Sequence, residues 1–114
     1  MENNLSSLDT AFHALADPTR RAVVAKLATG PASVMDLAAP FEMGLPSFLK
    51  HIKVLEDSGL IRSEKTGRVR TCCIIPKRLA ATEDWLSGQR AIWEGRTDRL
   101  AAYVETKHHQ DSAK

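Results

Sequence analysis

Apolar residues recur at helical spacing in several stretches of this chain. The first stretch predicts a helix that ends near Ala16, and its apolar stripe consists of Leu5, Leu8, Phe12 and Leu15. Asp17 and Pro18 are residue types that cap and open a second helix, which the pair Gly30 and Pro31 ends. The N-terminal part of the chain is therefore expected to be helical.

Two further helices are expected before residue 60. Ser33, followed three residues later by Asp36, is a capping-box signature, and it predicts a short third helix that ends at Pro40. After a turn at residues 41–44, residues 45–58 repeat the helical spacing. The buried face of this fourth helix is predicted to hold Phe48, Ile52 and Leu55, and the opposite face Ser47, Lys50 and Lys53. A helix anchored by its apolar stripe then presents cations and a hydroxyl outward.

The segment after the fourth helix has the composition of a β-hairpin. Gly59 ends the helix at the position that a left-handed cap prefers. Residues 60–64 and 68–75 are rich in β-branched side chains, and residues 65–67 (Lys65, Thr66 and Gly67) join them. A pair of helices followed by a basic hairpin predicts a mostly α fold with a small β-hairpin wing. In such a winged helix-turn-helix, the second helix of the pair enters the major groove of DNA.

The distribution of charge agrees with that placement. The net charge is only +2, but residues 44–78 hold eight Lys or Arg against three Asp or Glu, whereas the flanking parts are weakly acidic. A basic face of this kind is often simply solvated. Because this one coincides with the predicted reading helix and wing, it is expected to contact phosphates.

A long amphipathic helix is predicted over residues 79–104. Leu86, Trp93 and Leu100 stand seven residues apart in it, and Trp85 and Tyr103 lie nearby. Aromatic residues of this kind are enriched in interfaces that exclude water, so the helix is expected to pack on a second copy of the chain. The alternative is that these residues complete the core of a monomer. Residues 1–104 are read as a single domain and residues 105–114 as a flexible polar tail.

Two stretches resemble a known family. FHALADPTRRAVVAKLATGPASVMDLA is similar to the opening helices of the ArsR/SmtB winged-helix regulators, and LPSFLKHIKVLEDSGLIRSEKTGRVR is similar to their reading helix and wing. The resemblance extends over residues 8–104. It implies a homodimeric repressor that binds double-stranded DNA at an inverted-repeat operator and is released by an effector, here unknown.

The resemblance and the helical spacing together give candidate residues, with Lys53 and the interface residues of the last helix coming from the spacing. The expected DNA contacts are Pro46, Ser47, Leu49, Lys50, His51 and Lys53 in the reading helix and Lys65, Arg68 and Arg70 in the wing. The expected dimer interface joins the first and last helices through Leu5, Leu8, Phe12, Trp85, Leu86, Trp93, Leu100 and Tyr103. Where the family often carries serine, this chain has Leu49, which offers an apolar contact to a thymine methyl group. His51 is read equally well as a DNA contact or as a packing residue.

The patterns of the family's metal-sensing branches are missing from this sequence. Their third helix carries paired cysteines, where this chain has Val34 and Met35, or their last helix carries spaced Asp and His ligands, whereas residues 79–104 contain no histidine. No cofactor is therefore expected. A pair of histidines, His108 and His109, with Glu105 and Asp111 nearby, remains an alternative metal site.

Cys72 and Cys73 are neighbours on a predicted strand and point to opposite faces, so they form no disulfide. Cys73 is expected to be a small core residue, and Cys72 to share the outer face with Arg68 and Arg70. Cations lower a thiol pKa, so redox sensing through Cys72 is an alternative to simple packing.

Other classes of function find little support. Candidate catalytic groups such as His13, Glu83 and Asp84 are scattered, and neither a Gly-rich phosphate loop nor a nucleophile elbow is present. An enzyme is not expected. A winged-helix adaptor that binds protein in place of an operator is the other alternative.

Without an apolar run long enough for a membrane span or a signal peptide, the chain is expected to be cytoplasmic.

Overall fold

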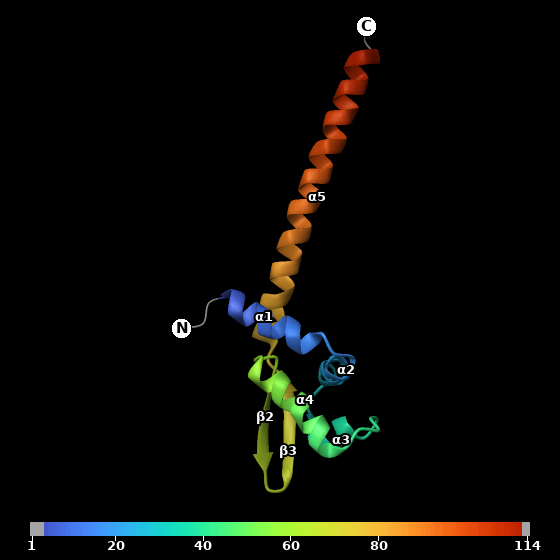
Figure 1. Cartoon of the computed structure of the whole chain (residues 1–114). Coiled ribbons are helices and arrows are strands. Elements are labelled where there is room, and N and C mark those ends of the chain that lie inside the picture. The colour runs from blue at the N-terminus through green and yellow to red at the C-terminus, as the bar shows by residue number, and fades with distance from the viewer. Residues whose placement is uncertain (1–3, 113–114) are drawn as a thin grey trace. The chain divides into compact units, whose positions relative to one another are not determined.

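The computed structural model describes the backbone of residues 4–112, and all side chains within it except those of residues 4–6, 97 and 108–112. Its elements in chain order are α1 (Asn4–Leu15), α2 (Pro18–Leu27), β1 (Ala32–Ser33), α3 (Val34–Ala38), α4 (Leu45–Asp57), β2 (Ile61–Thr66), β3 (Val69–Ile74) and α5 (Pro76–Ser112) (Figure 1). The chain divides into two units, one up to Thr82 and one from Glu83 onward. The mostly helical fold with a small antiparallel wing is as predicted.

The helix ends follow the local sequence signals. The Asp17 carboxylate accepts a hydrogen bond from the Arg20 N–H at 3.0 Å, and the Ser33 hydroxyl accepts one from the Asp36 N–H at 3.1 Å. Both are N-caps, as expected. At the other end of α4, Gly59 has a φ of 80°, and its N–H and that of Leu60 donate to carbonyls in the last turn of the helix. This left-handed cap turns the chain directly from α4 into β2.

The wing differs from the predicted two-stranded hairpin because a third strand joins it. The sheet has the order β1-β3-β2 and is antiparallel throughout, with Ala32 opposite Cys72. A strand of two residues has no periodicity to detect, so it was missed. The hairpin loop is also shorter than expected: Gly67, with a φ of 64°, and Arg68 alone connect Thr66 to Val69. Glycine first in a two-residue loop suits the twist of the strands.

The core of the first unit joins all its helices to the sheet. Its largest fully buried side chains are Phe48, Leu55, Leu60, Ile61, Val23 and Cys72. The predicted inner face of α4 is confirmed, since Ile52 is buried as well. In α1 the fully buried residues are Ala11 and Ala14, whereas Phe12, which the sequence assigns to the dimer interface, is 36% exposed. Small alanines let the helix backbones approach closely, which a stripe of large residues would prevent.

The predicted faces of the two cysteines are reversed. Cys72 is completely buried and Cys73 only partly. The alternation along β3 is right, but α2 and α3 pack against β3 and the covered face is the one that carries Cys72, which the sequence could not show. Burial raises the pKa of the Cys72 thiol, the Glu56 carboxylate adds to the rise, and Arg70 opposes it. Cys72 is therefore a packing residue held as a thiol, and the physical argument for redox sensing through it fails.

Thiol labelling should distinguish the two cysteines. With the folded protein, we expect a thiol reagent to modify one site rapidly, at Cys73, and Cys72 only on unfolding, because a buried protonated thiol is neither accessible nor nucleophilic. Mass spectrometry of the digested protein identifies the site. In a Cys73→Ser protein the rapid phase should vanish; its persistence would show that Cys72 is accessible.

Helix α5 begins before the predicted residue 79 and continues to Ser112, through the segment expected to be a flexible tail. Its first turns belong to the first unit, where Leu79 packs against the core and the buried Thr82 hydroxyl donates to the Arg78 carbonyl at 3.0 Å. From Glu83 onward the helix forms the second unit. Within the described residues, no helix combines the length and apolarity that a membrane crossing requires.

Candidate nucleic-acid interface

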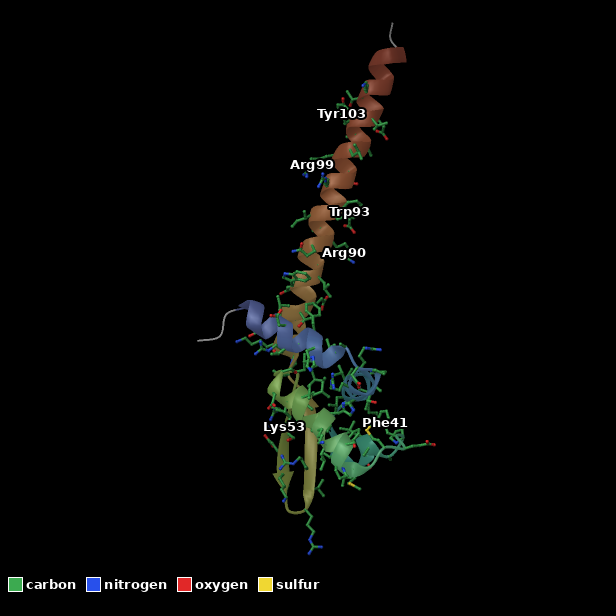
Figure 2. The ribbon with its side chains drawn as sticks, in the orientation of Figure 1. Phe41, Lys53, Arg90, Trp93, Arg99 and Tyr103 are labelled. Atoms are coloured by element: carbon green, nitrogen blue, oxygen red, sulfur yellow. The ribbon has the colours of Figure 1, made fainter. Side chains whose placement is uncertain are left out.

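Helix α4 is held by its inner face and presents a mixed outer face. While Phe48, Ile52 and Leu55 are buried, Pro46, Ser47, Lys50 and Lys53 are exposed and Leu49 is 42% exposed. Lys53, labelled in Figure 2, forms an exposed ion pair with Asp57 in which Nζ lies 3.4 Å from the carboxylate. Such a pair is worth little in water, so Lys53 can exchange its partner for a phosphate at small cost. The outer face thus combines cations, a hydroxyl and an apolar side chain, which are the groups that contact phosphates and base edges.

The start of α4 adds backbone donors to this face. Gly44 is its N-cap residue, no side chain caps the helix, and proline occupies the second position. Pro46 has no N–H and the Phe48 N–H donates to the Gly44 carbonyl, so the donors that the first turn can offer are the N–H groups of Leu45 and Ser47. Together with the helix dipole they favour a negative group such as a DNA phosphate.

The wing is cationic at its tip and is tied to α4 at its base. Lys65 and Arg70 are directly opposite each other in the register of β2 and β3, and Arg68 lies in the loop. Arg70 donates from Nη1 to the Ser63 hydroxyl at 2.9 Å, and that hydroxyl donates to the Glu56 carboxylate at 2.7 Å. Figure 1 shows the hairpin beside α4. This chain of hydrogen bonds couples the orientation of the wing to the helix.

His51 lies at the edge of α4 toward α2 and is half-buried, which fits the packing interpretation. Its Nδ1 atom is 3.1 Å from Nη1 of Arg20 and 3.8 Å from the Asp17 carboxylate. A guanidinium can only donate, so Nδ1 of the neutral imidazole accepts and the ring proton is on Nε2. Arg20 therefore fixes the orientation of the His51 ring. Any hydrogen bond from His51 to DNA would be donated by Nε2.

Arg20 is a structural residue that the sequence reasoning missed. It donates from Nε to the Ala14 carbonyl at 2.7 Å, from Nη2 to the His13 carbonyl at 3.0 Å and from Nη1 to His51. One side chain thus joins the end of α1, the start of α2 and the middle of α4. The only signal in the sequence was its position three residues after the Asp17 cap.

The Asp17 carboxylate completes this junction. The hydrogen bond from the Arg20 N–H lowers the pKa of Asp17, partial burial opposes it, and the positive charge of Arg20 lowers it further. The carboxylate therefore stays ionised in its role as the α2 cap. A negative cap at a helix N-terminus is also favoured by the helix dipole.

The candidate dimer residues on α5 are exposed in the single chain, as an interface helix requires. Trp93 is 66% exposed, and Trp85, Leu86, Leu100 and Tyr103 are also exposed; Figure 2 shows Trp93 and Tyr103 standing out from the helix. On α1, Leu8 is partly buried and Phe12 partly exposed, while the side chain of Leu5 lies outside the described residues. The pairing of α1 with α5 in a dimer stays a prediction.

The described side chains contain no group of three His, Cys, Asp or Glu residues that could hold a metal ion. The alternative site at His108 and His109, with Glu105 and Asp111, rests on side chains of which all but Glu105 lie outside the described residues.

The arrangement of a helix pair, an exposed reading helix and a basic wing defines a winged helix-turn-helix DNA-binding protein. A family model described as a helix-turn-helix domain matches residues 15–64. The chain is 41% identical over 75 residues to the HTH-type transcriptional regulator Rv2034 of Mycobacterium tuberculosis, an alignment that spans 66% of this chain and 70% of that protein. It is 30% identical over 61 residues to the transcriptional repressor SdpR of Bacillus subtilis, spanning 54% and 68%.

A solved structure narrows the class further. The crystal structure of an ArsR family transcriptional regulator is 55% identical in sequence, with a TM-score of 0.77, and the alignment covers 82% of this chain and 97% of that one. This chain belongs to the ArsR family of transcriptional regulators. The resemblance noted in the sequence is thereby confirmed.

Proposed function

We propose that this protein is a homodimeric repressor that binds an inverted-repeat operator in double-stranded DNA through α4 and the wing. The proposal is supported by the way α4 is held. Its inner face is buried along Phe48, Ile52 and Leu55, and its exposed, cationic face lies next to the basic hairpin. The relative SdpR, whose name describes a repressor, supports the direction of regulation. A DNA operator makes the cytoplasm its place of action.

The direct test is a fluorescence titration of the protein with DNA from its own upstream region, beside a scrambled duplex of equal length, at low and moderate salt. We expect tighter binding to the upstream DNA and a steep loss of affinity with salt, because phosphate contacts release counterions. Equal, weak binding to both duplexes would contradict autoregulation. Binding to neither would favour the adaptor hypothesis.

Two single substitutions should separate base contacts from phosphate contacts. Lys50→Ala is expected to cost about 1 to 3 kcal/mol on the operator and to reduce discrimination, because Lys50 lies on the exposed face of α4. Arg68→Ala, in the wing loop, should weaken binding to every duplex alike and lower the salt slope by about 1. The same titrations measure both effects. A loss of discrimination in the Arg68 variant would reverse the two assignments.

The dimer is proposed to form through α1 and α5, with Trp93 near its centre. We expect Trp93→Ala to weaken self-association by about 2 kcal/mol or more, because buried tryptophans dominate interface energies. Sedimentation equilibrium over a range of protein concentrations measures this. Asp98→Ala, on another side of the same helix, is the control and should leave the dimer unchanged. Equal losses of self-association in both variants would show that this face of α5 is not the dimer interface.

A further inference from the structure

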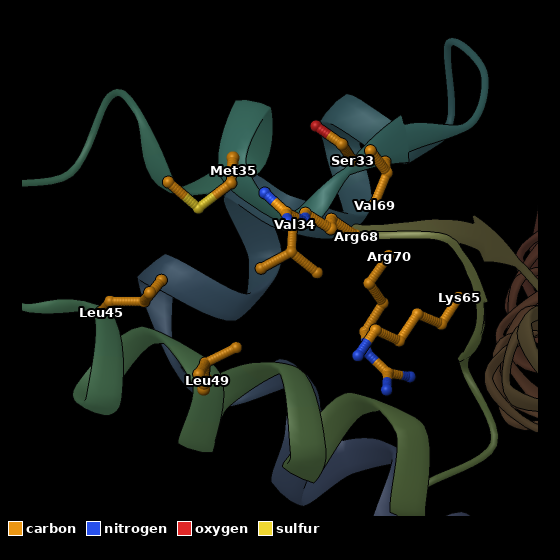
Figure 3. Close-up of a pocket in the computed structure, with 9 residues that line it drawn as sticks. All are labelled: Ser33, Val34, Met35, Leu45, Leu49, Lys65, Arg68, Val69 and Arg70. Carbon is orange, nitrogen blue, oxygen red and sulfur yellow. The ribbon is translucent and has the colours of Figure 1, made fainter.

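A hollow lies between the reading helix and the wing. Its volume is about 290 Å³, just below the roughly 300–1,000 Å³ typical of small-molecule sites. Figure 3 shows Leu45 and Leu49 of α4 on one side, Met35 and Val34 of α3 facing them, and Lys65 and Arg70 of the wing together at one end. All of these residues belong to the first unit.

The cationic end of the hollow has an arrangement that sheets normally avoid. Lys65 and Arg70 are cross-strand partners, and like charges placed directly opposite each other destabilise a pair of strands. They continue the row in which Ile61 faces Ile74 and Ser63 faces Cys72, so they lie on the sheet face that covers the core. Of the described residues, none that lines the hollow is acidic. An anion between the two cations would remove their repulsion.

Apart from Ser33 and Arg68, the other residues that line the hollow are apolar. An apolar lining is not needed to bind a phosphate. Met35 is 65% exposed, Leu45, Leu49 and Val69 are also exposed, and Val34, which also lines the hollow, is buried. Apolar side chains gathered in a concave site and exposed to water mark a binding surface. The hollow therefore combines an apolar wall with a pair of cations at one end.

We propose that this hollow binds an amphipathic organic anion, with the acid group between Lys65 and Arg70 and the apolar body against Met35, Leu49 and Val69. A ligand held there occupies the space between the reading helix and the wing, so DNA and ligand exclude each other. This second part rests on the proposed function, because it assumes that the same face binds DNA. The ligand would then be the effector that releases the operator.

The test uses decanoate, a medium-chain carboxylate, below its micelle point and with the protein free of DNA. In two-dimensional NMR spectra of isotopically labelled protein, decanoate should shift the signals of Val34, Leu49 and Val69. Acetate and the uncharged decanol should each bind about tenfold more weakly, because acetate lacks the apolar body and decanol lacks the carboxylate. Shifts that are absent, or that fall on the exposed apolar residues of α5, would overturn the site.

A matched pair of variants separates this hollow from a general attraction of decanoate to apolar surface. Met35 and Ile92 are equally exposed, at 65% and 66%, but Ile92 is on α5, outside the hollow. Met35→Ser should weaken decanoate binding about fivefold, and Ile92→Ser should leave it unchanged. Equal effects of the two substitutions would refute the proposal.

Competition with DNA is measured last, by adding decanoate to the complex with upstream DNA. Release at decanoate concentrations that fill the hollow is the expected result. An unchanged complex with the hollow filled would overturn the exclusion. If the protein binds no operator, the proposed function fails, while the NMR titration of the free protein still decides whether the hollow binds the anion.

Discussion

Replacing Phe48 with alanine should lower the free energy of unfolding by about 3 to 5 kcal/mol. The Phe48 side chain is completely buried, and its ring lies 5.6 Å from that of Phe41, centroid to centroid. Because a domain of this size is stable by only about 5 to 15 kcal/mol, the loss would remove much of the folded population and operator binding with it. Urea unfolding followed by circular dichroism measures the change.

The control for this prediction is the next residue on the same helix. Leu49 is 42% exposed and points away from the core, so Leu49→Ala should change the free energy of unfolding by no more than about 0.5 kcal/mol. The two variants therefore distinguish the buried face of α4, which holds the helix in place, from the exposed face, which is proposed to contact DNA. A large loss of stability in the Leu49 variant would mean that α4 is rotated about its axis relative to the arrangement described.

Replacing Arg20 with methionine should cost about 2 to 4 kcal/mol of stability. The substitution keeps much of the apolar stem but removes the donor to the Ala14 carbonyl and to Nδ1 of His51, and it leaves the His13 carbonyl with the Ala16 N–H alone. Arg21 is a matched control, since it is exposed and donates only to the Leu15 carbonyl at 2.9 Å. Arg21→Met should cost well under half as much in the same urea experiment.

The Arg20 variant also has a spectroscopic readout that a general loss of stability would not produce. In the native protein, at a pH where the imidazole is uncharged, nitrogen NMR of His51 should show the ring proton on Nε2, because Nδ1 accepts from Arg20. Without the guanidinium, the two tautomers should both be populated. A proton on Nδ1 in the unaltered protein would exclude the proposed orientation of His51.

Most of the fold could be predicted from the sequence because its signals are local. The cap residues Asp17 and Ser33, the apolar spacing of α4 and the left-handed glycine at residue 59 all act within a few residues, and each element appears where they indicated. The exposed cations of α4 and the wing follow from the same spacing. Membership of the family followed from two stretches that together contain these elements.

The remaining features depended on contacts between distant parts of the chain. The strand β1 exists only because Ala32 and Ser33 pair with β3. The packing of α2 and α3 against β3 decides that Cys72 and not Cys73 enters the core. Alternation along a strand separates two faces but does not say which one is covered. Likewise, Arg20 acquires its role from carbonyls of α1 and from His51, 31 residues away.

By itself, then, the sequence determined the order and type of the elements, the anchored face of the reading helix and the basic wing, since these depend on periodicity and capping. Only the tertiary structure decided which side of the wing is buried, which tautomer His51 adopts, and that Lys65 and Arg70 meet beside an apolar hollow. The physical reason is that burial and partner choice are properties of packed surfaces, and a pattern along one chain does not specify which surfaces meet.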